Sequence, residues 1–259
     1  MTSLLIGHTG FVGGALHRAG KFDVAMNSAS ISEIKGGEFD LVICAGARSR
    51  KWWANENPTA DADEIAALTS SLKTIKAREF VLISTIDVYP QTIYSRRVDE
   101  DEPLNIHDHT QAYGRHRLGL EKWVQETFSN SRIVRLPALF GVGMKKNALF
   151  DLLHANNLER LNPRSQFQWY PLRWLMYDIV EMLEKNWRVL NLFPEPLSTE
   201  DIRAAFFPSA VLGPRNTPLA EYNITSKYFP FPGYRATRAE ILGEMADFII
   251  AERNTPCQP

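Results

Sequence analysis

The chain has 259 residues, of which 44% are hydrophobic and 23% charged, and its formal net charge at pH 7 is -1. This composition is typical of a folded globular protein and excludes a disordered chain. The near-zero net charge gives no electrostatic reason to expect nucleic acid or an anionic membrane as a partner. The sequence shows neither an apolar run near the ~20 residues that cross a bilayer nor a signal-peptide pattern, so we expect a cytoplasmic protein.

The two cysteines, Cys44 and Cys257, lie far apart in the sequence. In a reducing compartment both are expected as free thiols, and two are too few for a zinc site. Three histidines, His107, His109 and His116, lie near an acidic stretch but lack the spacing of metal ligands. We therefore interpret them as surface residues and expect no metal.

The first predicted element is a short buried strand over residues 4–6, which a turn with the spacing Gly7-x-x-Gly10-x-x-Gly13 follows. Such a turn can hold a dinucleotide, because its glycines permit a tight turn, a close approach to the pyrophosphate and close packing of helix against strand. Glycine-rich turns also occur without a ligand, but the spacing and the preceding strand favour a cofactor. The residues expected to contact it are Gly7, Thr9, Gly10, Phe11, Val12 and Gly13.

A second strand is predicted over residues 22–26, and Asn27 and Ser28 follow it, where the ribose of a dinucleotide would lie. An acidic residue that binds both ribose hydroxyls usually occupies this position, and Asn27 is not acidic. Because a neutral side chain does not repel a 2′-phosphate, we expect NAD or NADP as cofactor, with NADP slightly favoured. The alternative is that Asn27 and Ser28 are ordinary turn residues.

Two further buried strands are predicted over residues 41–44 and 80–83. The first of them ends in Ala45, Gly46 and Ala47, whose small side chains would let a cofactor approach. The second runs into Thr85 and Asp87. At the carboxyl end of a central strand, Thr85 is a candidate catalytic hydroxyl and Asp87 a candidate substrate contact.

A long helix is expected from Thr110 to residue 128, with Tyr113 and Arg117 one turn apart on the same face. A fifth strand over residues 133–136 ends at Pro137, which is also expected beside the cofactor. The alternation of strands and helices predicts an α/β fold, a Rossmann-type doubly wound parallel sheet with helices on both faces. We expect the cofactor-binding domain to span residues 1–136, with a returning segment near residues 175–195.

The pattern loosens after residue 136, where many prolines and aromatic residues predict a smaller, irregular substrate-binding region over residues 137–259. Helices are expected over residues 147–156, 178–185, 198–206 and 237–252. Lys145, Lys146 and Asn147 open the first of these. Two cations at a helix N-terminus are candidates to bind the diphosphate of a nucleotide sugar, and the alternative is a solvated basic turn.

The glycine turn, Thr85 four residues before Tyr89, and Tyr113 near a helix start together resemble the extended short-chain dehydrogenase/reductase superfamily. Within it the chain is similar, over residues 3–141, to the NAD-dependent epimerase/dehydratase family, many of whose members alter nucleotide-activated sugars. The resemblance implies that Thr85 and Tyr113 are catalytic. Arg117 stands where the family has a lysine, and Ala138 replaces an asparagine that often meets the substrate. A homodimer is a further expectation.

A phenol with a pKa near 10 is a poor base at neutral pH, so Tyr113 needs a cation nearby. We expect Arg117 to stabilise the tyrosinate and to bind the nicotinamide ribose, while Thr85 hydrogen-bonds the substrate oxygen. The expected function is that of an NAD(P)-dependent oxidoreductase, epimerase or dehydratase that acts on a nucleotide-activated sugar or a related small carbonyl or alcohol. Tyr113 and Arg117 could instead be an exposed pair on an amphipathic helix, and the protein a catalytically weak redox sensor or scaffold that binds NAD(P).

Overall fold

The computed structural model describes residues 2–214 and 216–254, and Cys257 lies outside this range. Contacts between residues divide the chain into two units. The first unit comprises residues 1–93, 101–136 and 173–191, and the second comprises residues 94–100, 137–172 and 192–259. What each part binds is not decided by this division, so the cofactor-binding domain and the substrate-binding region remain predictions.

A six-stranded sheet with the order β2-β1-β3-β4-β5-β9 forms the centre of the first unit. All five strand pairings are parallel. The strands are β1 (Ser3–Ile6), β2 (Val24–Met26), β3 (Glu38–Cys44), β4 (Lys76–Thr85), β5 (Ser131–Leu136) and β9 (Val189–Asn191). The predicted α/β fold with a doubly wound parallel sheet is confirmed.

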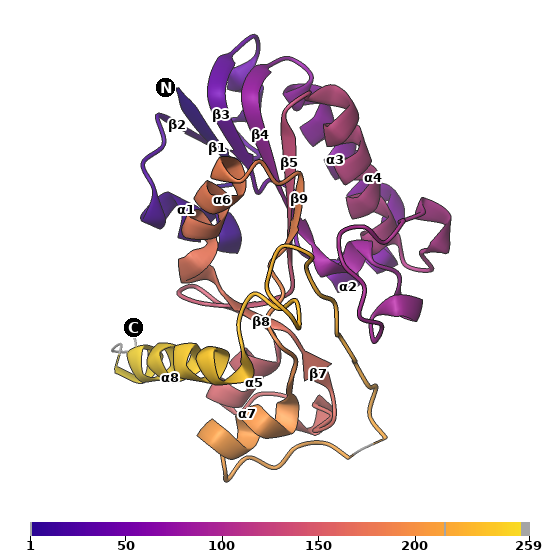
Figure 1. Cartoon of the computed structure of the whole chain (residues 1–259), viewed down its shortest axis with the longest axis vertical. Helices are drawn as coiled ribbons and strands as arrows, with labels where there is room; N and C mark the ends of the chain where they lie inside the picture. The colour runs from indigo at the N-terminus through magenta and orange to yellow at the C-terminus, as the bar shows by residue number, and fades with distance from the viewer. Residues whose placement is uncertain (1, 215, 255–259) are drawn as a thin grey trace. The chain divides into compact units, whose positions relative to one another are not determined.

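Helices cover both faces of this sheet (Figure 1). The helix α1 (Phe11–Ala19) packs with α6 (Leu175–Glu184) on one face, and α3 (Pro58–Leu72) packs with α4 (Ala112–Thr127) on the other, where α2 (Lys51–Glu56) also contacts α4. Strands covered on both sides need apolar residues on both faces. The runs at Leu4–Ile6 and Val42–Cys44, each at most 1% exposed, meet that need.

The strand order reverses direction between β1 and β3, because β2 lies on one side of β1 and every later strand of the sheet lies on the other. In open α/β sheets, ligands bind at the carboxyl ends of the strands beside such a switch point. Gly7 follows β1 there, and Ala45 and Gly46 follow β3. The fold therefore places the glycine turn where a ligand site is expected.

The second unit is built from short elements. Strand β6 (Ala138–Phe140) pairs with β8 (Trp169–Pro171), and β7 (Gln166–Phe167) pairs with β10 (Leu197–Ser198). Its α-helices are α5 (Ala148–His154), α7 (Thr199–Phe206) and α8 (Arg238–Asn254). A capping box formed by Ser198 and Asp201 begins α7. The helices predicted near residues 147, 198 and 237 are present.

In the described part of the chain, no helix is long and apolar enough to cross a membrane, and no cluster of three His, Cys, Asp or Glu residues could hold a metal. Cys44 is a free, buried thiol at the end of β3. Burial raises its pKa to about 11, so this thiol stays protonated at neutral pH.

Candidate active site

The glycine turn brings the start of α1 against the ends of β1 and β3. Gly7 has φ 88°, and a Cβ there would lie 2.5 Å from the carbonyl oxygen of Ala45. At Gly13 a Cβ would lie 2.0 Å from the carbonyl oxygen of Gly7. No side chain fits at either position, because real Cβ contacts are never this short, and the turn depends on both glycines.

The start of α1 presents unpaired backbone donors. Gly10 is the N-cap, and among the described residues no side chain caps this helix. The N–H groups of the first turn, from Phe11 to Gly13, have no acceptor within the helix. Together with the positive end of the helix dipole they form a cradle for an anion, and this cradle fits the pyrophosphate of a dinucleotide.

The end of β2 lies beside this cradle, because the Gly7 N–H donates to the carbonyl of Met26 at 2.7 Å. Asn27 follows, and its Oδ1 accepts from the N–H of Ala29 at 2.9 Å. The carboxamide therefore shapes the local turn, as the turn alternative supposed, while Nδ2 takes no part in that bond. Ser28 is exposed beside it. Neither residue carries a negative charge toward the expected ribose position.

The catalytic candidates lie on α4 and at the end of β4. Tyr113 is 5% exposed and Arg117 4% exposed, so the interpretation of an exposed pair on an amphipathic helix is wrong. The guanidinium carbon of Arg117 lies 4.6 Å from the ring centroid of Tyr113. At Gly114 a Cβ would come 2.2 Å from the carbonyl oxygen of Asp87. The missing side chain lets α4 approach the turn after β4 and brings Tyr113 to it.

That turn contains Thr85 and Asp87. The Asp87 N–H donates to the Thr85 Oγ1 at 3.2 Å, which caps a short 3₁₀ helix, Ile86–Val88. Lys51 Nζ lies 2.6 Å from Asp87 Oδ1, so the carboxylate that was expected to meet substrate carries an ion pair from α2. The structure thus brings Thr85, Asp87 and Tyr113 together, with Lys51 paired to Asp87.

The first turn of α4 is fixed by Asn55. Its Oδ1 accepts from the Tyr113 N–H at 3.0 Å, and its Nδ2 donates to Gln111 Oε1 at 3.2 Å. The helix begins at Ala112 with Gln111 as N-cap, and the expected cap at Thr110 is wrong. A side chain from α2 therefore satisfies a donor at the start of α4 that Thr110 was expected to satisfy.

The phenol of Tyr113 sits in a site that opposes ionisation. Burial raises its pKa, and the negative charge of Asp87 adds to the rise. The positive charge of Arg117 and the hydroxyl of Thr85 act in the opposite direction but do not offset the burial. Arg117 thus lowers the pKa of Tyr113 as expected, but the pKa as a whole lies above its ordinary value, and the catalytic roles of the two residues remain a prediction.

Arg117 is held by a buried carboxylate that sequence reasoning missed. Its two terminal nitrogens donate to Asp61, Nη1 to Oδ2 at 3.2 Å and Nη2 to Oδ1 at 2.9 Å, and Nη2 also donates to the Arg48 carbonyl at 2.6 Å. The Nε–H is buried without a partner among the described residues. An unpaired buried donor needs an acceptor, and a ribose hydroxyl supplies one, so this residue also fits a nicotinamide dinucleotide.

For two of the three histidines, the expectation of a surface position is wrong. His116 is half-buried, and its Nδ1 lies 2.8 Å from Asp61 Oδ2. His109 is 9% exposed and packs against the position of Gly114. The spacing of charged residues along α4 gave no sign of this burial, because charged residues four positions apart are also common on exposed helix faces.

The remaining candidates belong to the second unit. Lys145 and Lys146 are exposed. Asn147 is the N-cap of α5, where its Oδ1 accepts from the Phe150 N–H at 2.9 Å and its Nδ2 donates to the Leu139 carbonyl at 2.8 Å. The amide of Asn147 thus stabilises the helix start. Contact of these residues with a diphosphate, and of Pro137 with a cofactor, remains a prediction.

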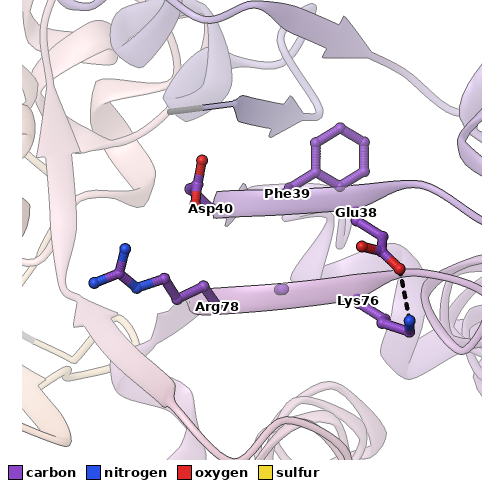
Figure 2. Close-up of a pocket in the computed structure, with 6 residues that line it drawn as sticks. Glu38, Phe39, Asp40, Lys76 and Arg78 are labelled. Atoms are coloured by element: carbon purple, nitrogen blue, oxygen red, sulfur yellow. Dashed lines mark hydrogen bonds and ion pairs between the residues drawn. The ribbon is translucent and has the colours of Figure 1, made fainter.

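A hollow in the first unit lies away from these residues, at the amino ends of β3 and β4 (Figure 2). Glu38 and Lys76, the first residues of the two strands, form an exposed ion pair of 2.6 Å at its rim. Asp40 and Arg78 lie further along the same strands. Because Thr85 and the glycine turn lie at the opposite, carboxyl ends, this hollow is separate from the candidate active site.

Neither a protein-family model nor a curated protein sequence matches this chain. Solved structures match it at low sequence identity. A dTDP-glucose 4,6-dehydratase from Streptomyces venezuelae with NAD bound is 14% identical with a TM-score of 0.75, and 98% of each chain is covered. A dTDP-4-dehydrorhamnose reductase from Clostridium acetobutylicum is 17% identical with a TM-score of 0.66 over 98% of this chain and 100% of the other.

A UDP-N-acetylglucosamine 4-epimerase from Methanobrevibacter ruminantium is also similar, with 11% identity, a TM-score of 0.74, and 97% of this chain and 98% of the other covered. At these identities the likeness shows a shared fold, and it extends over nearly the whole of each chain. The structural neighbours include a reductase, a dehydratase and an epimerase, so the fold is compatible with each of these reactions.

Proposed function

We propose that this protein is an NAD(P)-dependent oxidoreductase of the extended short-chain dehydrogenase type, with a nucleotide-activated sugar or a related small carbonyl or alcohol as substrate. The observation that carries the proposal is the anion cradle at the switch point of the sheet, formed by the glycine turn and the uncapped start of α1. Gly7, Gly10 and Gly13 would hold the pyrophosphate. The same unit holds the buried residues Thr85, Tyr113 and Arg117.

A bound nicotinamide would supply or accept the hydride. Tyr113 would transfer the proton at the substrate oxygen, and Thr85 would donate a hydrogen bond to that oxygen as charge develops on it. Arg117 would donate its Nε–H to the ribose, since both terminal nitrogens are bound to Asp61 and the Arg48 carbonyl. Lys145, Lys146 and Asn147 are proposed contacts of the substrate diphosphate.

A thermal-shift screen of NAD, NADP and nucleotide sugars tests the proposal, because a ligand that binds only the folded protein raises its melting temperature. Gly10→Val should abolish the cofactor-dependent shift, since a branched side chain would occupy the pyrophosphate position. At Gly10 even a Cβ lies 3.3 Å from the Gly7 carbonyl oxygen. Gly243→Val, where nothing lies within 4 Å of a Cβ, is the matched control and should keep the shift. If the parent binds neither cofactor, the proposal is wrong.

We propose that the cofactor site tolerates the 2′-phosphate of NADP, because Asn27 and Ser28, which follow β2, carry no negative charge. Calorimetry should show NADP bound at least as tightly as NAD. A tenfold preference for NAD, about 1.4 kcal/mol, would reverse this assignment.

The second candidate is a protein that binds NAD(P) with little turnover, as a redox sensor or scaffold. One observation favours it, since the charge of Arg117 is paired with Asp61 and does not make Tyr113 a base at neutral pH. Tight cofactor binding without turnover of any nucleotide sugar, ketone or alcohol in a broad panel would support this candidate over the enzyme.

A further inference from the structure

The cation beside Tyr113 has its own counter-ion. Asp61, on the first turn of α3, is 2% exposed and accepts from both terminal nitrogens of Arg117 in a bidentate pair. His116 shares this carboxylate through the contact at 2.8 Å. Bidentate pairs of this kind fix the orientation of the guanidinium as well as its distance. Asp61 therefore fixes the orientation of the guanidinium, and the edge that faces away from Asp61 carries Nε.

The two charged residues that act on the phenol, Arg117 and Asp87, each have a partner of opposite charge. On α4 itself, Arg117 is paired with Asp61 from α3, and His116 contacts the same carboxylate. From the turn after β4, Asp87 is paired with Lys51 from α2. A cation within a few ångströms favours a phenolate, and a carboxylate bound to that cation opposes this preference. The site as a whole is close to electrically neutral around a buried hydroxyl.

We propose that Asp61 is a positioning residue that neutralises Arg117 and keeps Tyr113 as a phenol, so that the site is built to reduce a carbonyl group. The inference rests on the proposed function and selects one direction of it. The substrate class is a ketone or aldehyde, such as the keto group of a nucleotide-linked sugar. Burial is the main cause of the raised pKa of Tyr113, and the positive charge of Arg117 opposes it, so neutralisation of that charge by Asp61 would keep the phenol protonated.

The movement of protons and electrons in carbonyl reduction explains why a protonated Tyr113 favours this reaction. A bound reduced nicotinamide would supply the hydride to the carbonyl carbon and would be oxidised. The pair of electrons of the C=O π bond moves to the carbonyl oxygen, which takes the proton of the Tyr113 phenol. The O–H bond of Tyr113 breaks, its electron pair stays on the phenolate oxygen, and a solvent proton restores the phenol. Oxidation of an alcohol begins instead with the phenolate, which this site disfavours.

The test is the titration of Tyr113, followed by NMR of protein labelled with ¹³C at the tyrosine Cζ, with Tyr113→Phe to assign the signal. Asp61→Asn keeps an acceptor for Arg117 but removes the negative charge, so the phenol pKa should fall by about 1 to 3 units. Asp63→Asn, the same change at an exposed position of α3, is the matched control and should leave the Tyr113 titration unchanged.

Two further variants keep the test valid if Asp61→Asn does not fold. Arg117→Gln should raise the phenol pKa, because it leaves the Asp61 charge without its partner. The double variant Asp61→Asn/Arg117→Gln removes both charges and should titrate like the parent. The inference is overturned if Asp61→Asn leaves the titration at the parent's position, or if the double variant titrates where Arg117→Gln does.

The titration needs neither cofactor nor substrate, so its outcome is independent of cofactor binding. If cofactor binds but Asp61→Asn does not move the phenol, the proposed function stands and the inference about Asp61 fails. Once a substrate is known, Asp61→Asn should shift the pH profile of alcohol oxidation toward neutral pH. An unchanged pH profile would also overturn the inference.

Discussion

Two buried arginines in the first unit each lie over a buried tyrosine, and they differ in one respect. Arg117 lies 4.6 Å from the ring of Tyr113, and Arg135 lies 5.0 Å from the ring of Tyr89. Each arginine is paired with a buried carboxylate, Arg117 with Asp61 at 2.9 Å and Arg135 with Glu121 at 2.7 Å. Both networks include α4, where residues 117 and 121 are one turn apart.

The two arginines differ in how many of their nitrogens are hydrogen-bonded. Arg135 uses all three nitrogens, with Nε and Nη2 on Glu121 and Nη1 on the Tyr89 hydroxyl at 2.9 Å. The same hydroxyl accepts from Asn191 Nδ2 at 2.8 Å, which ties β9 to the network. Arg117 leaves Nε unpaired in the part of the chain that the structure describes. A closed network of this kind fixes α4 on the sheet, and an open one has a donor left for a ligand.

The largest expected contrast is between the two tyrosines. Tyr113→Phe removes the proton-transfer group and should lower turnover by about 10²- to 10⁴-fold, while cofactor affinity measured by calorimetry stays near that of the parent. Tyr89→Phe removes two hydrogen bonds in the closed network, so it should lower the free energy of unfolding and leave kcat close to that of the parent. Equal losses of kcat in both variants would erase the distinction.

The second contrast concerns stability. Glu121→Gln leaves the buried guanidinium of Arg135 without its counter-ion and should lower the free energy of unfolding by about 3–5 kcal/mol in urea titrations. Glu126→Gln, the same change at an exposed position of α4, should alter it by less than about 0.5 kcal/mol. A Glu121→Gln loss as small as that of the control would mean that the closed network does not hold α4.

A third prediction uses the open donor of Arg117. Arg117→Met should weaken cofactor binding about 10- to 100-fold, because a hydrogen bond from a charged donor contributes about 1.5–3 kcal/mol. Arg117→Lys should keep part of the affinity and of the activity, since lysine restores the charge but not the planar arrangement of donors in the guanidinium. Arg78→Met, at the hollow shown in Figure 2, is the control and should bind like the parent. Parent-like turnover by Arg117→Met would contradict the catalytic assignment.

The smallest effect is a pH dependence of stability. Because the pKa of Tyr113 is raised, the folded protein keeps a proton that the unfolded chain releases above about pH 10. This stabilisation is complete below that pH and is lost as the pH rises toward the folded pKa, by at most about 1.4 kcal/mol per pH unit. Tyr113→Phe should remove this part of the alkaline slope in urea titrations, and Tyr177→Phe, at an exposed position, should retain it.

The sheet and the glycine turn were predictable because their signals are local. Three or four consecutive apolar residues mark the strands β1, β2, β3 and β4, and the Gly7-x-x-Gly10-x-x-Gly13 spacing directly follows the first of them. The returning segment expected near residues 175–195 contains β9, which pairs with β5. In each case a few neighbouring residues determine the element.

The ion pairs were not predictable, because they join residues far apart in the sequence. Asp61 and Arg117 are separated by 56 positions, and Lys51 and Asp87 by 36. Spacing within α4 put Tyr113 and Arg117 on one face but could not say that this face is buried. For the same reason sequence reasoning gave Arg117 a free charge, and only the fold revealed the carboxylate that neutralises it.

The strands of the sheet in the first unit become shorter toward both edges. Its central strand β4 has ten residues, and the edge strands β2 and β9 have three each. An edge strand exposes unpaired backbone N–H and C=O groups, which can template the addition of a strand from another molecule. An edge strand of three residues offers few backbone hydrogen bonds to a strand from another molecule. Concentrated solutions of the folded protein should therefore resist the intermolecular β-association that begins at open sheet edges.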